Sequence, residues 1–310
     1  MLTVLQTALE VGLIYGLVAL ALFISFSILN IADLSTDGCF TLGCAVGAML
    51  TIAGHPILAL FAAMAAGMLS GYVTAFLQTR LGVESILAGI ISNTGLYTIN
   101  LAVMGFSSNV SITGVDTVFS LFKGLVGGQW SRLILLALIA AVVVIVLIRF
   151  FGTSLGLSIR ATGDSLDMVS ASSINPKATI TIGLCLANAL TALSGCLIGE
   201  YNKFCDINLG TGMVTIALAS LIIGEVFAGH RGGVGKRIVC VVLGSIVYRF
   251  IIALALRLNI SAEYFKLVSA VIVAVAIAAP NMKGYVHLAK IKSNARKLRA
   301  LSGKGDETDA

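Results

Sequence analysis

The sequence has 310 residues, of which 58% are hydrophobic and only 11% are charged, and its mean hydropathy is +1.03. A soluble domain is about 25% charged, because it needs a polar surface in contact with water. The shortage of charge therefore excludes a soluble enzyme, a nucleic-acid-binding module and a disordered protein, and it predicts an all-α polytopic membrane protein.

Long apolar runs predict helices rather than barrel strands, because they lack the period-two alternation of strands. A spanning helix needs about 20 apolar residues. Runs of this kind predict about nine transmembrane helices, with a range of about eight to ten. The expected spans are 5–29, 37–53, 57–79, 85–105, 132–150, 179–200, 209–228, 238–257 and 264–280.

Several spans contain glycines four residues apart, such as Gly12-x3-Gly16, Gly43-x3-Gly47 and Gly67-x3-Gly71. Small residues at this spacing let two helices approach closely in a membrane. Ordinary small-residue content explains any single pair equally well.

The distribution of basic residues predicts the two sides of the membrane. Seven of the twenty Lys and Arg residues fall in the last 28 residues. Since basic residues favour the cytoplasmic side, the tail 286–310 is expected in the cytoplasm, basic and partly disordered. The rest of the chain, 1–285, is expected to be a single transmembrane domain.

Counting spans backwards from this tail places 151–178 and the Arg80–Glu84 turn on the cytoplasmic side. The same count places 106–131 and 201–208 outside. The N-terminus also falls outside, unless one re-entrant segment reverses it.

The cytoplasmic segment 151–178 is too long for a turn. Asp164, with Leu166 and Met168 after it, has the pattern of a helix N-cap, and the helix is expected to stop near Ile174, because the residue before Pro176 disfavours helical geometry. A short amphipathic helix of this kind either inserts into a groove on a partner or lies on the lipid surface.

The segment also carries the pattern G-x3-R-A-x-G, followed by A-x-S-I-N, and a span comes directly after it. This pattern resembles the cytoplasmic coupling loop of ATP-binding-cassette (ABC) importer permeases of the branched-chain amino acid and ribose type. The family more often has Gly where this chain has Ser173, and the loop Gly224-x8-Gly233-Val-Gly235 extends the resemblance. The most similar subgroup imports tryptophan, tyrosine or other hydrophobic amino acids.

The resemblance implies that this loop docks into a cleft on a cytoplasmic ATPase subunit. Closure of two such ATPases would then move the helices of two permease copies by alternating access. The residues expected to couple to the ATPase are Gly156, Arg160, Asp164, Asp167, Ser170, Ala171, Ile174, Asn175 and Pro176.

The resemblance implies a homodimer in the bacterial cytoplasmic membrane, with two ABC ATPase subunits, an extracytoplasmic substrate-binding protein and the lipid bilayer as partners, and no nucleic acid. The loop Gly229–Arg237 is not a phosphate-binding loop, because its spacing is one residue too long and Arg237 replaces the hydroxyl residue. We therefore expect ATP and magnesium on the partner ATPase, and no catalytic residue, cofactor or metal in this chain.

Two polar breaks, Asn30–Gly38 and Asp206–Gly212, each follow a full-length span and precede a short apolar segment. Matching breaks of opposite orientation are typical of inverted repeats, so we expect two pseudo-symmetric halves with broken or re-entrant helices. Coincidental loop composition is the alternative. Ser35, Thr36 and Asp37 are expected to cap the first short helix, and Asn208 or Thr211 the second.

Broken helices usually line a cavity, because unpaired backbone is not tolerated against lipid. The residues expected along the translocation pathway are Asn30, Asp33, Ser35, Asp37, Asn93, Asn188, Asn208 and Thr211. For Asn93 and Asn188, hydrogen bonding between helices is the alternative. Arg249 is expected either to extend its charge outward or to pair with Glu225.

Three functions compete. The ABC permease has the strongest support, with an amino acid, a nucleoside or a sugar as the solute. An ion-coupled secondary transporter would use the same inverted repeats, but Asp33, Asp37 and Asp206 are thin support for an ion site. A membrane enzyme acting on lipid lacks a catalytic constellation.

Overall fold

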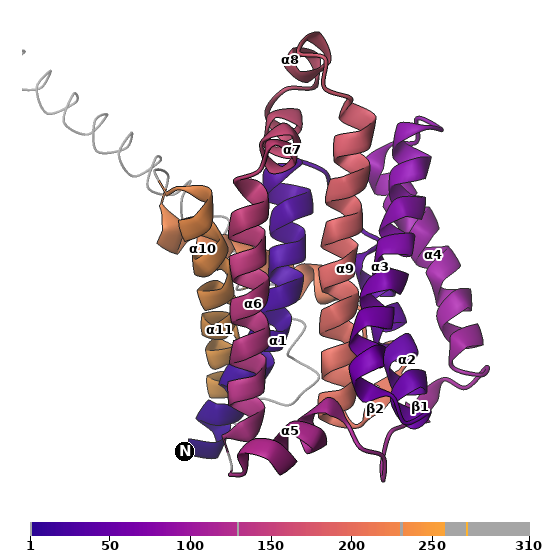
Figure 1. Ribbon diagram of the computed structural model, residues 1–310, viewed down its shortest axis with the longest axis vertical. Helices are drawn as coiled ribbons and strands as arrows, with labels where there is room; N and C mark the ends of the chain where they lie inside the picture. Colours follow the sequence, from indigo (N-terminus) through magenta and orange to yellow (C-terminus); the bar gives the residue numbers. More distant parts are fainter. Residues whose placement is uncertain (1, 129, 230–231, 258–270, 272–310) are drawn as a thin grey trace, which may run out of the picture.

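The computed structural model describes residues 2–128, 130–229, 232–257 and 271 as an all-helical bundle with one short pair of strands (Figure 1). Six of the described helices are long and apolar enough to cross a membrane. They are α1 (Leu2–Leu22, continued by the π-helix η1, Phe23–Ile28), α3 (Pro56–Thr79), α4 (Ser85–Val103), α6 (Ser131–Phe151), α9 (Pro176–Asn202) and α11 (Val234–Arg257).

Two further apolar helices, α2 (Thr36–Ile52) and α10 (Met213–Ala228), have only 17 and 16 residues. At about 1.5 Å per residue they are shorter than the hydrocarbon core of about 30 Å, and each follows one of the two predicted breaks. Eight of the nine predicted spans therefore coincide with helices. The ninth span, 264–280, apart from residue 271, and the tail 286–310 lie outside the described residues.

Helices α1 and α9 form the centre of the bundle. In the most apolar stretch of each helix, 83% of the residues are buried in α9 and 72% in α1, against 22% in α6. The hydroxyl of Ser194 on α9 donates to the carbonyl of Ile14 on α1 at 2.7 Å. Figure 1 shows α2, α3 and α4 on one side of this pair and α10 and α11 on the other.

Glycines allow these helices to touch at backbone distance. A Cβ atom built at Gly43 would lie 2.0 Å from the carbonyl oxygen of Ala192, and one at Gly195 would lie 1.9 Å from that of Phe40. Helices α2 and α9 therefore cannot keep this spacing with any larger residue at either position. The other glycines of the predicted pairs also face neighbouring helices: Gly12 and Gly16 face α11, and Gly47, Gly67 and Gly71 face α9.

One end of the bundle is closed by a short sheet and a helix. Strand β1 (Asn109–Ser111) pairs antiparallel with β2 (Phe204–Asp206). Helix α5 (Val118–Val126) begins with a capping box, in which the side chains and amides of Thr117 and Ser120 bond reciprocally. The strand pairing places 106–131 and 201–208 at the same end, as the charge pattern predicts.

The other end carries α7 (Ser154–Asp164) and α8 (Leu166–Ala171), which project beyond the bundle in Figure 1. The prediction that Asp164 caps a helix reaching Ile174 is wrong. Asp164 is the last residue of α7, and Ser165 caps α8 by accepting the Met168 amide at 3.3 Å. Both residue types are good caps, and only Ser165 has the extended backbone that a cap requires.

The turn after α8 follows the prediction more closely. The helix ends before Pro176, and Asn175 has an extended backbone, as expected for a residue that precedes proline. The Asn175 side chain accepts the Lys177 amide at 3.0 Å, so it caps α9, which begins at Pro176 rather than at residue 179.

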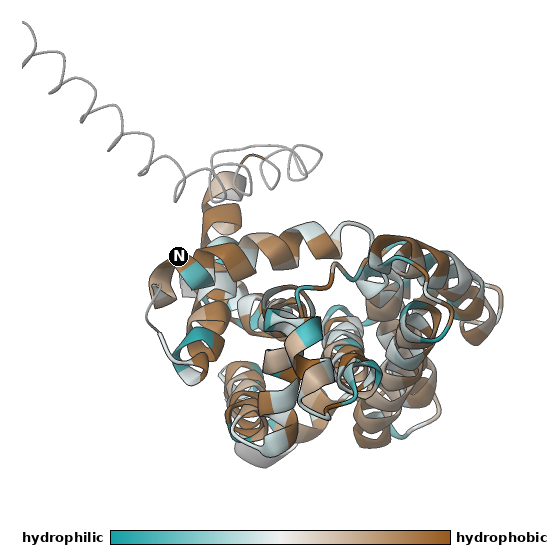
Figure 2. Cartoon of the chain, turned by 90° about the horizontal axis from the view of Figure 1, so that it is seen from above, coloured by the Kyte–Doolittle hydropathy of each residue, from teal (hydrophilic) through white to brown (hydrophobic). Residues whose placement is uncertain are grey.

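The outer faces of α3, α4 and α6 are covered by large exposed apolar side chains. Leu69 is 68% exposed, Phe61 65% and Ile145 59%. Figure 2 shows hydrophobic colouring along most of the helices of the bundle. Such an extensive apolar surface requires lipid or another apolar partner, so the chain is a multi-pass membrane protein.

The glycine contact between α2 and α9 predicts the outcome of a matched pair of substitutions. Gly195→Ala places a methyl group against the Phe40 carbonyl and should destabilise the bundle by about 1–3 kcal/mol. Gly95→Ala on α4 meets no atom within 4 Å and should leave stability unchanged or raise it slightly. Thermal unfolding in detergent measures both, and equal midpoints for the two variants would contradict the contact.

Candidate functional site

The first break is held by a buried carboxylate. Asp33, only 3% exposed, accepts hydrogen bonds from the Ser35 amide at 2.9 Å and the Ser35 hydroxyl at 2.6 Å. Its second oxygen accepts the Asn188 side-chain amide at 2.9 Å. Three of the predicted pathway residues thus meet in one cluster, and Asn188 ties the break to the middle of α9.

The second break is capped from the first. The Asp37 carboxylate accepts the Gly212 amide through Oδ2 and the Val214 amide through Oδ1, both at 2.9 Å. Gly212, the N-cap residue of α10, has φ +86° and contributes no side chain. A negative group at a helix N-terminus also interacts favourably with the positive end of the helix dipole. Asp37 therefore stabilises the start of α10 both by accepting its free amides and by its charge.

This arrangement corrects the predicted caps. Asn208 and Thr211 are exposed, and neither side chain caps α10. Ser35 does occupy the N-cap position of α2, but it makes no side-chain capping bond, since its hydroxyl donates to Asp33 instead. The hydroxyl of Thr36 donates to the Asp33 carbonyl at 3.1 Å.

The two breaks lie in contact with each other. The Gly210 amide donates to the Thr41 hydroxyl at 3.1 Å, and a Cβ atom at Gly210 would lie 2.0 Å from the Asp37 carbonyl oxygen. Only glycine permits this approach of one break to the other. We call the contacts of Asp37 and Thr41 with residues 210–214 the helix-start junction.

Helix α4 brings two amides to the same helix start. The Asn100 side chain donates to the Gly38 carbonyl at 3.0 Å, and a Cβ atom at Gly38 would lie 2.6 Å from the Asn93 side-chain oxygen. Asn93 therefore lies beside α2, near the junction. Asn30, which has φ +56°, is exposed just after η1.

Two contributors to this region, Thr41 and Asn100, are not among the predicted pathway residues, and neither is Glu200, which lies at the other end of α2. Thr41 and Asn100 stand within apolar runs, and their small polar side chains give no sign of which helix they face. Glu200, 1% exposed on α9, accepts the Thr51 hydroxyl at 3.0 Å and the Val118 amide at 2.8 Å, so it anchors the start of α5. A carboxylate near the end of an apolar span was the available signal for Glu200.

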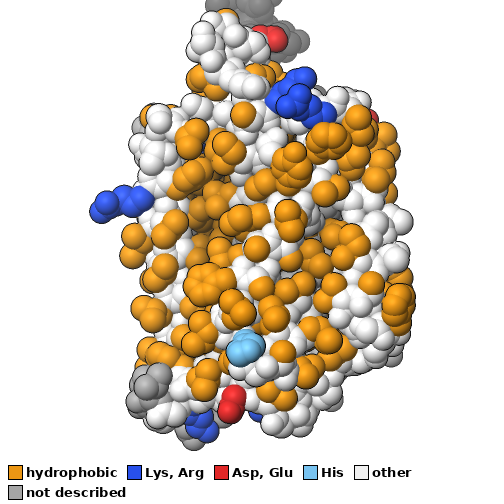
Figure 3. Space-filling model, turned by 45° about the vertical axis from the view of Figure 1, so that its right-hand side comes forward, with side chains coloured by type: hydrophobic (Ala, Val, Ile, Leu, Met, Phe, Trp, Pro, Cys, Tyr) orange, Lys and Arg blue, Asp and Glu red, His pale blue; other side chains and the backbone are white. Residues whose placement is uncertain are grey.

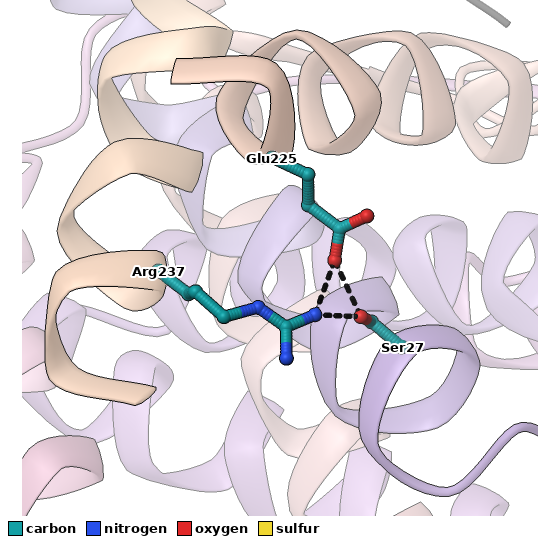
Figure 4. Close-up of polar contacts among 3 residues, drawn as sticks. All are labelled: Ser27, Glu225 and Arg237. Atoms are coloured by element: carbon teal, nitrogen blue, oxygen red, sulfur yellow. Dashed lines mark hydrogen bonds and ion pairs between the residues drawn. The ribbon is translucent and has the colours of Figure 1, made fainter. Parts of the chain in front are cut away.

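A second polar cluster joins η1, α10 and α11 (Figure 4). The Glu225 carboxylate accepts the Ser27 hydroxyl at 2.5 Å and the Arg237 guanidinium at 2.6 Å. The same Arg237 nitrogen lies 2.5 Å from the Ser27 hydroxyl oxygen. The cluster fixes the α10–α11 hairpin to the end of the first span.

The possible pairing of Arg249 with Glu225 is wrong. Glu225 pairs with Arg237 in the first turn of α11, whereas Arg249 lies about 18 Å further along that helix. The Arg249 guanidinium carbon lies 3.8 Å from the centre of the Tyr15 ring, a cation–π contact.

The predicted coupling segment is anchored at its base and exposed at its tip. Gly156 is buried where α6 turns into α7, and the Thr162 hydroxyl lies 2.8 Å from that of Thr179 on α9. Gly163 packs against the carbonyl of Ile28, since a Cβ atom there would lie 1.8 Å from it. Helix α7 therefore contacts both central spans.

At the tip, α8 presents apolar side chains that cover nothing. Leu166 is 53% and Met168 65% exposed, while Val169 is 2% exposed and holds the helix in place. Six of the predicted coupling residues are also exposed: Arg160, Asp164, Asp167, Ser170, Ala171 and Asn175. Ile174 and Pro176 are half-buried.

A family model described as the permease component of the branched-chain amino acid transport system matches residues 4–277. The chain belongs to this family. The match covers both breaks, the helix-start junction and the whole of 151–178, so these features lie within the family domain. The chain is accordingly a transport permease of the ABC systems, as the coupling pattern predicts.

Two curated relatives span nearly the whole chain. The tyrosine transport system permease protein of Clostridioides difficile (strain R20291) is 31% identical over 294 residues, 94% of this chain and 95% of the relative. An uncharacterised protein of Rickettsia prowazekii (strain Madrid E) is 31% identical over 277 residues, 88% of this chain and 96% of the relative. No solved structure matches the sequence.

The junction predicts the effect of removing one charge. Asp37→Asn keeps one carbonyl acceptor and loses a charge-assisted bond, so the variant should unfold about 1.5–3 kcal/mol more easily. Asp206→Asn is the matched control, because Asp206 also accepts a backbone amide, from Asn208 at 2.8 Å, but in an exposed turn. Thermal unfolding in detergent ranks the two. An Asp37→Asn protein as stable as the control would show that the junction contributes nothing.

Proposed function

We propose that the chain is the membrane-spanning subunit of an ABC importer that takes up a small hydrophobic or aromatic amino acid. The family match over residues 4–277 carries the proposal. The relative described as a tyrosine transport system permease supports an amino acid of this class as the solute. In this proposal two copies form the pathway in the bacterial cytoplasmic membrane, and a binding protein delivers the solute from outside.

The proposal assigns ATP hydrolysis to two partner ATPases, which hold the ATP and magnesium, and gives this chain no catalytic residue or cofactor. The exposed Leu166 and Met168 of α8 suit a groove on such a partner. Because α7 is bonded to α9 through Thr162 and packs on η1 through Gly163, a push on α8 reaches both central spans. On this assignment the α8 end and the C-terminal tail are cytoplasmic.

The proposed pathway passes the helix-start junction. Asp33 and Asp37 are engaged by hydrogen bonds from Ser35, Asn188 and backbone amides, so neither carboxylate offers a free charge to a passing solute. Such a path binds weakly and leaves selection to the binding protein. The exposed residues Asn30 and Asn208 belong, in this proposal, to its two ends.

Reconstitution tests the function directly. The chain, its ATPase and its binding protein are placed in proteoliposomes, and uptake of radiolabelled tyrosine, leucine, ribose and adenosine is measured with and without ATP. Tyrosine or leucine uptake that requires ATP and the binding protein is the expected result. Uptake that persists without ATP but collapses with an uncoupler would establish an ion-coupled transporter instead, and ribose or adenosine uptake would correct the solute.

If α8 docks on the ATPase, substitutions at its exposed apolar side chains should weaken ATPase association without destabilising the fold. Leu166→Asp with Met168→Asp should reduce association with the ATPase by at least about tenfold, because central apolar contacts dominate interfaces. Stability should change by less than about 0.5 kcal/mol, since both side chains are exposed.

The control is Phe106→Asp, an equally apolar side chain that is 76% exposed at the opposite end of the bundle. It should leave ATPase association unchanged. Co-purification from detergent measures association, and the assignment of α8 fails if the double variant retains its ATPase.

A further inference from the structure

A cavity of about 340 Å³ opens between the end of α3 and the beginning of α9. It is separate from the helix-start junction, and α8 does not line it. Its lining combines aromatic rings, basic side chains and polar groups, chiefly those of Tyr72, Phe76, Thr79, Arg80, Asn175 and Lys177.

The charge of this cavity is uniformly positive. Arg80, which follows α3, and Lys177, in the first turn of α9, both line it, and no carboxylate does. The only ion pair found among the residues that the structure describes joins Arg237 to Glu225, so neither cation is neutralised by this part of the chain. The cavity therefore favours an anionic group.

The depth of the cavity indicates where that anion comes from. The apolar spans Pro56–Thr79 and Pro176–Asn202 both terminate at it, which places it where hydrocarbon meets headgroups. Tyr72 and Phe76 are 53% and 43% exposed, and their ring centres lie 6.4 Å apart. Aromatic side chains at this level are typical of a membrane interface.

The apolar half of the cavity continues along α3. Leu69 and Val73, 68% and 53% exposed, lie one helical turn before Tyr72 and Phe76 on the same outward face. Figure 3 shows basic side chains near the upper rim of a face that is otherwise largely apolar. The surface thus has a cationic end and a long apolar stretch. It is complementary to an amphiphile with an anionic headgroup and an apolar tail.

We propose that this cavity binds an anionic phospholipid, with the phosphate between Arg80 and Lys177 and an acyl chain along Leu69 and Tyr72. Basic pockets between transmembrane helices on the cytoplasmic side recognise such headgroups. A second copy of the chain does not suit the site, because a two-fold contact here would bring like charges together. The bound lipid braces the first turn of α9, which directly follows the coupling segment.

The test measures lipid binding by the purified full chain in neutral detergent. Native mass spectrometry compares phosphatidylglycerol with phosphatidylcholine of the same acyl chains. The wild-type chain should retain phosphatidylglycerol preferentially. The double variant Arg80→Gln, Lys177→Gln should lose about 10- to 30-fold in apparent affinity for phosphatidylglycerol and be unchanged for phosphatidylcholine.

The matched control is Arg149→Gln with Lys236→Gln, which removes two exposed basic residues from the same end of the bundle without touching the cavity. It should bind phosphatidylglycerol as the wild type does. If both double variants lost the same affinity for phosphatidylglycerol, or if neither lost any, the proposed site would be overturned and the lipid binding would be non-specific. Displacement of the lipid by an equal concentration of inorganic phosphate would overturn it in favour of a soluble anion, and an unchanged lipid profile with lost ATPase binding would assign the cavity to the protein partner.

Discussion

A membrane offers no water to a broken helix, and this constraint organises the middle of the protein. Helices α2 and α10 are too short to cross the bilayer, so their first amides must be satisfied by the protein itself. The Asp37 carboxylate does this for α10, bonding Gly212 and Val214 at 2.9 Å. Asp33 does the equivalent for the turn before α2 and reaches Asn188 on the central helix α9.

Close packing makes this arrangement possible. Gly210 touches the backbone of Asp37, and Gly195 touches that of Phe40, so the helix starts and the central helix approach at backbone distance. A change in the position of α9 would therefore be transmitted to both breaks. Because α7 is bonded to α9 and packed on η1, the exposed α8 is connected to the same core through α7.

Much of this could be read from the sequence, because membrane solvation acts on runs of residues. Eight predicted spans coincide with helices, and the small-residue patterns of Gly43 and Gly67 lie at helix contacts. The coupling pattern around Arg160 identified the family that the comparisons show. The caps were less predictable, since Asp164 and Ser165 are equally suitable residue types and only the backbone geometry distinguishes them.

The sequence by itself determined the membrane class, the positions of eight apolar helices, the exposed tip within 151–178 and the family, because hydropathy and local motifs need no knowledge of neighbours. Only the tertiary structure decided which polar groups meet. Asp37 caps a helix that begins some 175 residues later, and Glu225 pairs with Arg237 rather than Arg249. Such partners are selected by helix packing and depth in the membrane, which no local pattern records.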